Sequence, residues 1–274
     1  MPTSWIGPTS GNGARVNTLQ SIGTAVSLTY NAGGSITDTR YLMLAQCSYR
    51  PVSGTITALS VSDNMTGTGW TLHSSGILSA VDLSSNTWYS AFAWKVLTHA
   101  DWLALGGGGI GNPVVSFTVT AGTATQYNFA IIIGDLWSVS AAGQAPIGPD
   151  IQAAHGYNHG VTAFSYTPAS GSGRPLDADQ LAYQAHTFLM NFGGGIYSVT
   201  PTFIGATMNL ATNLNFGGDN YAQTVNLGGV TASATPATNT FAGTMFAGSN
   251  PNYLLAFGAT FYYGPPADIQ VMIV

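Results

Sequence analysis

Hydrophobic and polar residues alternate with a period of two along most of the chain. Residues 26–30 place Val26, Leu28 and Tyr30 on one side, with Ser27 and Thr29 on the other. Residues 114–120 alternate in the same way, with Val115, Phe117 and Val119 facing the core. A period of two is the repeat of a β-strand, not that of a helix. The pattern therefore predicts a protein built from strands.

Three longer segments predict strands of the interior. Residues 41–49 are apolar at nearly every position, as expected for a strand that is buried on both faces. In residues 87–96 one face carries Trp88, Phe92, Trp94 and Val96, and the other carries Tyr89, Ala91, Ala93 and Lys95. In residues 127–137 the alternation groups Tyr127, Phe129, Ile131 and Ile133 on one face.

Two segments do not clearly follow the alternation of a strand. Residues 177–192 fit either a helix capped by Asp177, with Gln180 completing a capping-box spacing, or a strand across 182–192. Residues 143–160 are rich in Pro and Gly and predict a long loop.

We predict an all-β fold, a jelly-roll or related two-sheet antiparallel β-sandwich. Residues 1–20 are expected to form an extended arm. Residues 21–274 are expected to form a single sandwich domain, with a possible internal boundary near 143–160. No internal repeat with a clear period is visible in the sequence.

Composition supports strands and describes an unusual surface. Only 5% of residues are charged, no Glu is present, and Lys95 is the only lysine. Typical globular domains have about 25% charged residues. The surface must therefore consist mainly of Ser, Thr, Asn, Gly and Gln, which lacks the charges that keep cytosolic proteins apart. Such a surface is either covered by neighbouring subunits or works outside a cell.

Charge and cysteine content exclude several classes of protein. Five basic residues and a net charge of −5 argue against nucleic-acid binding, which needs a basic patch. Cys47 is the only cysteine, and its apolar flanks predict a buried, unreactive thiol. The first residues show no signal peptide, and no apolar run is long enough for a membrane helix. We expect synthesis in a host cytoplasm and no membrane insertion. Assembly into a virion would explain why a protein made in the cytoplasm has a surface with so few charges.

The stretch LSVSDNMTGTGWTL, residues 59–72, predicts a β-hairpin. Asp63 and Asn64 suit an Asx-type turn, Gly67 and Gly69 tolerate positive φ, and Trp70 re-enters the sheet. This stretch lies between RYLMLAQCSYR and NTWYSAFAWKV, and VVSFTVT and YNFAIIIG follow. The order resembles phage virion proteins described as minor tail or tail-fibre proteins, especially those of phages that infect actinobacteria.

The resemblance covers about a third of the chain and departs from the family pattern at two places. The turn NMTGTG is longer than the tight Gly-Asn turn of the family, and residues 97–113 replace a short turn. The resemblance implies a non-enzymatic structural component of a phage virion, most simply a minor tail, tail-tip or fibre protein. A capsid decoration protein and a carbohydrate-binding module for host envelope glycan are the alternatives.

Partners follow from the same expectation. The chain is expected to associate with copies of itself, as a trimer or with higher symmetry, and with other virion proteins. Contact with a host cell-surface glycan is a further expectation. The arm and the C-terminal segment DIQVMIV, residues 268–274, are the candidate contact elements.

No catalytic constellation or cofactor motif is visible. Glu is absent and the Asp residues are scattered, so a paired-carboxylate site is not expected. Arg174, Asp177 and Asp179 predict a local ion pair or a helix cap. His155 and His159 have an H-x₃-H spacing, but two ligands in a Gly-rich loop do not define a metal site. We therefore expect no enzyme, no metal and no cofactor.

Aromatic residues in predicted loops are the remaining candidates for binding. Trp5, Trp102, Trp137 and Tyr157 are candidates for stacking on sugar rings or on a neighbouring subunit. The loop at 143–160 contains Tyr157 between the two histidines. We expect a contact between subunits, and not a metal ion, to order that loop.

Overall fold

A computed structural model describes the protein as an all-β chain, which confirms the predicted fold class. It describes residues 3–7, 14–17, 25–30, 40–65, 69–98, 100–101, 104, 113–139, 145–158, 163–166, 181–190, 199–203, 206–207, 209–215, 220–228, 240–245 and 251–264. Apart from the two helical residues 100–101, all the elements with bounds in these ranges are strands, and every strand pair is antiparallel.

The strands form four sheets, named here A to D. Sheet A contains β1 (Thr3–Gly7), β2 (Ala14–Asn17), β4 (Arg40–Pro51), β6 (Thr71–Leu72), β7 (Leu78–Val81), β8 (Thr87–Thr98) and β10 (Tyr127–Val139). Sheet B contains β3 (Ala25–Thr29), β5 (Ile56–Asp63) and β9 (Val114–Gly122). Sheet C contains β11 (Ala145–Asn158), β13 (Leu181–Met190), β16 (Asn209–Asn215), β17 (Asn220–Gly228) and β19 (Pro251–Gly264). Sheet D contains β12 (Ala163–Tyr166), β14 (Val199–Phe203), β15 (Ala206–Thr207) and β18 (Phe241–Met245).

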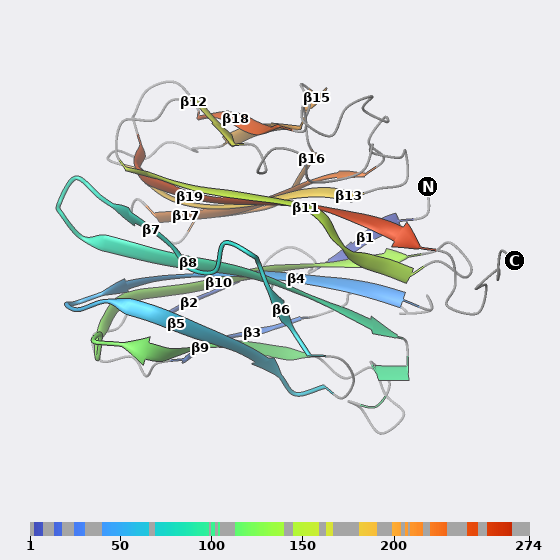
Figure 1. Cartoon of the computed structure of the whole chain (residues 1–274), viewed down its shortest axis with the longest axis horizontal. Helices are drawn as coiled ribbons and strands as arrows, with labels where there is room; N and C mark the ends of the chain where they lie inside the picture. The colour runs from blue at the N-terminus through green and yellow to red at the C-terminus, as the bar shows by residue number, and fades with distance from the viewer. Residues whose placement is uncertain are drawn as a thin grey trace, which may run out of the picture.

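The sheets stack in the order B, A, C, D, with A and C inside (Figure 1). The first half of the chain, through β10, builds sheets A and B. The second half, from β11 onward, builds sheets C and D. Each half is therefore a β-sandwich with a larger inner sheet and a smaller outer sheet, and the two inner sheets face each other.

Both halves have the same strand order. The inner sheets read β1-β10-β4-β8-β6 and β11-β19-β13-β17-β16, and the outer sheets read β3-β9-β5 and β12-β18-β14. In each half the chain crosses between its two sheets in jelly-roll order. The change from one half to the other falls at residues 140–144. The two halves share a buried interface. The expectation of a single domain over 21–274, with a possible boundary near 143–160, stays a prediction.

Equivalent strands meet at the centre of this interface. Ser48 on β4 donates a hydrogen bond of 2.9 Å to Thr187 on β13, and β4 and β13 hold the same place in their sheets. The contacts of β10 with β17 and of β19 with β8 are likewise equivalent. Strand order and these reciprocal contacts show a duplicated arrangement of the two halves. The duplication is clear in the strand order, although no repeat is visible in the sequence.

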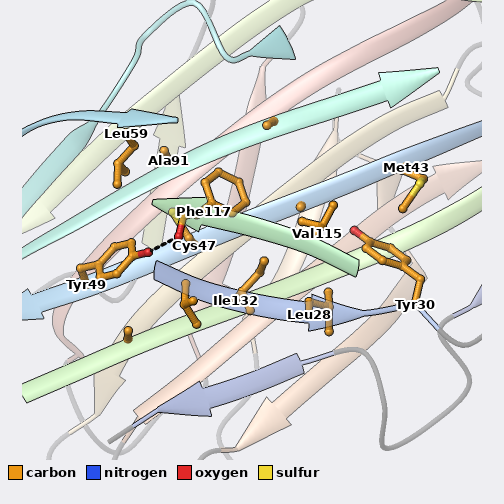
Figure 2. Packing of buried hydrophobic residues seen from close by; sticks show 14 of the residues in the cluster. Leu28, Tyr30, Met43, Cys47, Tyr49, Leu59, Ala91, Val115, Phe117 and Ile132 are labelled. Atoms are coloured by element: carbon orange, nitrogen blue, oxygen red, sulfur yellow. Dashed lines mark hydrogen bonds between the residues drawn. The ribbon is translucent and has the colours of Figure 1, made fainter. Parts of the chain in front are cut away.

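Strand β4 lies in the middle of the stack, and its two faces enter different cores. Tyr41, Met43 and Cys47 face sheet B, as Figure 2 shows for Met43 and Cys47, whereas Leu42 and Leu44 face sheet C. All five are buried. The prediction that residues 41–49 form a strand buried on both faces is confirmed.

Aromatic side chains fill the space between sheets A and C. Trp88 stacks on Tyr253 with ring centroids 4.5 Å apart, and Phe92 stacks on Tyr183 at 5.7 Å. The predicted faces of residues 87–96 are confirmed, since Trp88, Phe92 and Trp94 all lie in the core clusters on this side. Contacts of this kind add to the free energy gained from burial alone.

Three predictions about individual segments were wrong or are now decided. Residues 145–158 form β11, not a loop, and pair with β19 of the same chain. Residues 181–190 form a strand, which decides between the two alternatives for that segment. The described parts of the expected arm, β1 and β2, pair with β10 and extend sheet A.

The prolines explain why β11 was mistaken for a loop. Pro146 and Pro149 interrupt the alternation, but β11 is an edge strand, where a missing N–H is tolerated. The register shifts between Ile147 and Ile151, which places this irregularity beside the prolines.

Two further expectations are corrected by sheet geometry. Residues 59–72 are not a hairpin, because β5 pairs with β9 in sheet B and β6 pairs with β8 in sheet A. The turn therefore carries the chain from one sheet to the other. Tyr127 does not share a face with Phe129 and Ile133, because the register shifts between Tyr127 and Phe129.

The prediction from this packing concerns Gly134 on β10. A Cβ at this position would overlap the Tyr30 hydroxyl and lie 2.8 Å from the Leu44 carbonyl oxygen. We expect Gly134→Ala to lower the free energy of unfolding by about 1–3 kcal/mol, as overpacking does. Urea denaturation followed by tryptophan fluorescence measures this change. The control is Gly69→Ala, where nothing lies within 4 Å of the added Cβ; equal loss in both variants would contradict the packing.

Candidate functional site

A buried ion pair joins the two sheets of the first sandwich. Asp63 ends β5 in sheet B, and Lys95 lies on β8 in sheet A with its Nζ 2.7 Å from Asp63 Oδ2. Only 3% of the lysine side chain and 4% of the aspartate side chain are exposed. Burying two charges is costly unless the pair is close and further hydrogen bonds complete it.

The turn after β5 supplies those further hydrogen bonds. Trp70 Nε1 donates to Asp63 Oδ2 at 2.6 Å, and the Met65 backbone N–H donates to Asp63 Oδ1 at 2.9 Å. Asn64 Oδ1 accepts from the Val114 backbone N–H at 2.8 Å. The predicted Asx-type turn is therefore present. The Asp63 side chain faces the interior, and the hydrogen bonds from Met65, Trp70 and Lys95 fix the position of its carboxylate.

Polar contacts also cross between the two halves. Tyr183 donates a hydrogen bond of 2.8 Å to Asp135 Oδ2 across sheets A and C. At the rim, Gln152 Oε1 accepts from the Ser74 backbone N–H and Asn158 Oδ1 accepts from the Val81 backbone N–H. The bond between Tyr183 and Asp135 satisfies two buried polar groups inside the interface, and the two bonds at the rim are exposed.

His73 is the histidine of this interface. Its Nε2 donates to the Gly258 carbonyl oxygen at 3.2 Å, and its Nδ1 accepts from the Ser75 backbone N–H. The ring packs edge-on against Phe257 with centroids 5.4 Å apart. Burial lowers the pKa of His73 to about 4, although the hydrogen bond to Gly258 opposes this shift. The neutral imidazole is therefore the form that fits.

His186 occupies a similar place between sheets C and D. Its Nε2 lies 2.8 Å from Gln184 Oε1, which also accepts from the Tyr166 hydroxyl at 3.2 Å. The Gln184 amide donates to the Thr202 carbonyl oxygen at 2.8 Å. Burial lowers the pKa of His186 to about 3. No part of the imidazole is exposed to solvent, so the neutral ring is the form that fits this position.

The outward faces of the two outer sheets carry small uncharged residues. On sheet B the described outward residues include Ala25, Ser27, Thr29, Ser60, Ser62, Val114, Ser116, Thr118 and Thr120. On sheet D they are Ala163, Ser165, Thr200, Thr202, Ala242 and Thr244. We call these two surfaces the outer faces. Within these described residues neither face carries a charge or an aromatic ring.

Of the four aromatic residues singled out in the sequence, the structure describes the side chains of Trp137 and Tyr157. Trp137 lies in β10, only 4% exposed, so the expectation of a loop residue at the surface was wrong. Tyr157 is half-buried on β11, and its hydroxyl donates to the Ser165 carbonyl oxygen at 2.7 Å. Trp102 and the side chain of Trp5 lie outside the described residues, as does the segment 268–274.

The histidine pair is only half described. His155 is exposed on β11 and lies against Tyr157 with ring centroids 4.1 Å apart, whereas His159 is outside the described residues. Within the described ranges, no three His, Cys, Asp or Glu side chains gather as metal ligands. Arg174, Asp177 and Asp179 are also outside the described residues. Cys47 is buried, and burial raises the pKa of its thiol.

The Asp63–Lys95 pair is the residue combination that sequence reasoning missed. Both residues had been noted, Lys95 as the only lysine and Asp63 as a turn residue, but the hairpin prediction placed the turn at the surface. The sequence contained one signal for a buried ion pair, because the only lysine of the chain lies in a predicted interior strand. In the part of the chain that the structure describes, no helix is long and apolar enough to span a membrane.

Comparison with known proteins adds no relative. No family model matches the chain, and neither the curated proteins nor the solved structures contain a match.

The buried histidines predict how stability depends on pH. A histidine has a pKa near 6.5 when unfolded, so below that value the unfolded chain takes up protons that folded His73 does not. We expect full stability above pH 6.5 and a loss of about 3 kcal/mol from His73 as the pH falls to about 4. His186 extends the loss toward pH 3.

Urea denaturation at a series of pH values measures this loss. The variant His73→Gln removes one titrating group, so its stability should fall less steeply between pH 6.5 and 4. Gly69→Ala supplies the control, because it changes no titrating group and nothing lies within 4 Å of the added Cβ, so it should leave the slope unchanged. A slope that is the same in all three proteins would contradict the role of His73.

Proposed function

We propose that the chain is a non-enzymatic structural component of a phage virion, and that it associates with copies of itself. A minor tail, tail-tip or fibre protein is the form of this proposal that the order of motifs in residues 41–134 favours. The observation that carries the proposal is the chemistry of the two outer faces.

The outer faces suit contact with other protein subunits. Serine, threonine and alanine are small, so the outer faces can approach another surface closely over a wide area. Covering these faces takes no charge out of water. Burying an isolated charge without a partner is the largest penalty in such contacts. A freely dispersed protein usually keeps a mixture of charges on its surface. The outer faces lie on opposite sides of the stack, so one chain can contact two neighbours (Figure 1).

The buried polar residues support a structural function in the same way. Asp63, Lys95, His73 and Gln184 each form hydrogen bonds that hold one sheet to another. A catalytic group needs an accessible position and a partner that shares its site. In the described structure these groups face sheet interiors, where they fix the relative positions of the sheets.

The prediction concerns assembly. We expect the purified chain to sediment as a trimer or larger species, and Ser116→Arg to shift it toward the monomer. Ser116 lies at the centre of the outer face of sheet B, between Ser27 and Ser62, so an arginine there would have to be buried in the contact. Thr202→Arg tests the outer face of sheet D.

The matched control is Ser53→Arg, which adds the same charge in the exposed turn between β4 and β5. Sedimentation velocity and native mass spectrometry measure the species present. A wild-type chain that stays monomeric at micromolar concentration would contradict the proposal. Equal effects of Ser53→Arg and Ser116→Arg would show that net charge, and not the outer face, controls assembly.

A further inference from the structure

The position of Lys95 is unusual for this chain. Its other four cations are arginines, and none of the other 273 positions is lysine. Arginine is the usual cation of a buried ion pair, because its guanidinium is weakly hydrated and holds a carboxylate with two N–H donors. Lysine has a single amine, but that amine is a nucleophile when it has lost its proton. The chain uses lysine only where the amine touches a buried carboxylate.

We propose that Lys95 and Asp63 are joined in the mature protein by an intramolecular isopeptide bond. The contact shown by the structure is then the geometry from which the bond forms. The amide would link β8 of sheet A to the end of β5 in sheet B, so it would crosslink the two sheets of the first sandwich. The proposal does not depend on the proposed function.

The reaction balances without an oxidant or a further reactant. A proton moves from the Lys95 ammonium to Asp63 Oδ2 along their 2.7 Å hydrogen bond, which leaves a neutral amine beside a neutral carboxyl group. Nζ attacks Cγ and forms the new C–N bond. A second proton moves from Nζ to Oδ2, the Cγ–Oδ2 bond breaks, and one water molecule leaves. The products are the amide and water.

The hydrogen bonds around Asp63 suit this reaction. Oδ1 becomes negatively charged when the amine attacks, and the Met65 N–H already donates to it at 2.9 Å. A fixed N–H at the oxygen that gains charge is the arrangement that stabilises such intermediates. Trp70 Nε1 donates to Oδ2 at 2.6 Å and so holds the leaving oxygen toward the amine.

Burial supports both the rate and the extent of the reaction. The two side chains are 3% and 4% exposed, so the fold holds amine and carboxyl group together as an intramolecular pair of high effective concentration. Bulk water, which hydrolyses amides, has little access to the site. The neutral amide also avoids the cost of keeping two charges in the interior.

The crosslink would replace a disulfide that this chain cannot form. Cys47 is the only cysteine, so no intrachain disulfide is available. A bond between residues 32 positions apart restricts the unfolded chain as a disulfide does. It would also keep sheets A and B together under a mechanical load.

Intact-mass spectrometry of the purified full chain tests the proposal. The wild-type protein is expected to be lighter than its sequence by the mass of one water molecule. Lys95→Arg keeps a cation beside Asp63 but should show its full mass. Asp63→Ala removes the carboxyl group and should also show its full mass. Trypsin should cleave after residue 95 in Lys95→Arg and not in the wild-type protein.

A second aspartate provides the matched control. Asp82 also accepts a hydrogen bond from a tryptophan, Trp88 Nε1, and from the backbone N–H groups of Ser84 and Asn86, but no lysine touches it. Asp82→Asn should therefore still lose one water. A wild-type chain of full mass would overturn the proposal. A loss of water that persists in Lys95→Arg would also overturn it, because the dehydration would then lie elsewhere.

Discussion

The packing of sheet A against sheet C is the contact on which the rest of the structure depends. Each inner sheet is apolar on both faces, so each half of the chain would expose a row of aromatic rings if it stood alone. Phe92 and Trp94 of sheet A, and Phe257 and Phe261 of sheet C, are buried only because the two sheets cover each other. Burial of apolar side chains is the main favourable term in folding, so this interface holds the two sandwiches together.

This central contact also explains where the few charges are placed. The interior contains Asp63 with Lys95, and Asp135 with the Tyr183 hydroxyl, so buried acids have fixed partners. The outer faces carry hydroxyl groups in place of charges. The molecule therefore has an apolar interior with a few partnered charges and two outer faces without charges among their described residues.

Most strands were predictable from the sequence, because a period of two is a local property. The strands around Leu28, Phe92 and Phe117 follow directly from it. The duplication was not predictable, because equivalent strands keep their place in the sheet but not their sequence, as RYLMLAQCSYRP of β4 and LAYQAHTFLM of β13 illustrate. The partner of Lys95 was missed for a related reason. Asp63 ends β5 in sheet B and Lys95 lies on β8 in sheet A, and the sequence after β5 does not reveal which sheet the next strand joins.

Differential scanning calorimetry of the full chain tests the central claim most directly. If the A–C contact unites both sandwiches, the protein unfolds in a single transition, and its calorimetric enthalpy equals its van't Hoff enthalpy. This equality is expected at neutral pH and at concentrations where the association state is constant. Two separate transitions, each with its own enthalpy, would contradict the claim, because each sandwich would then be stable without the other.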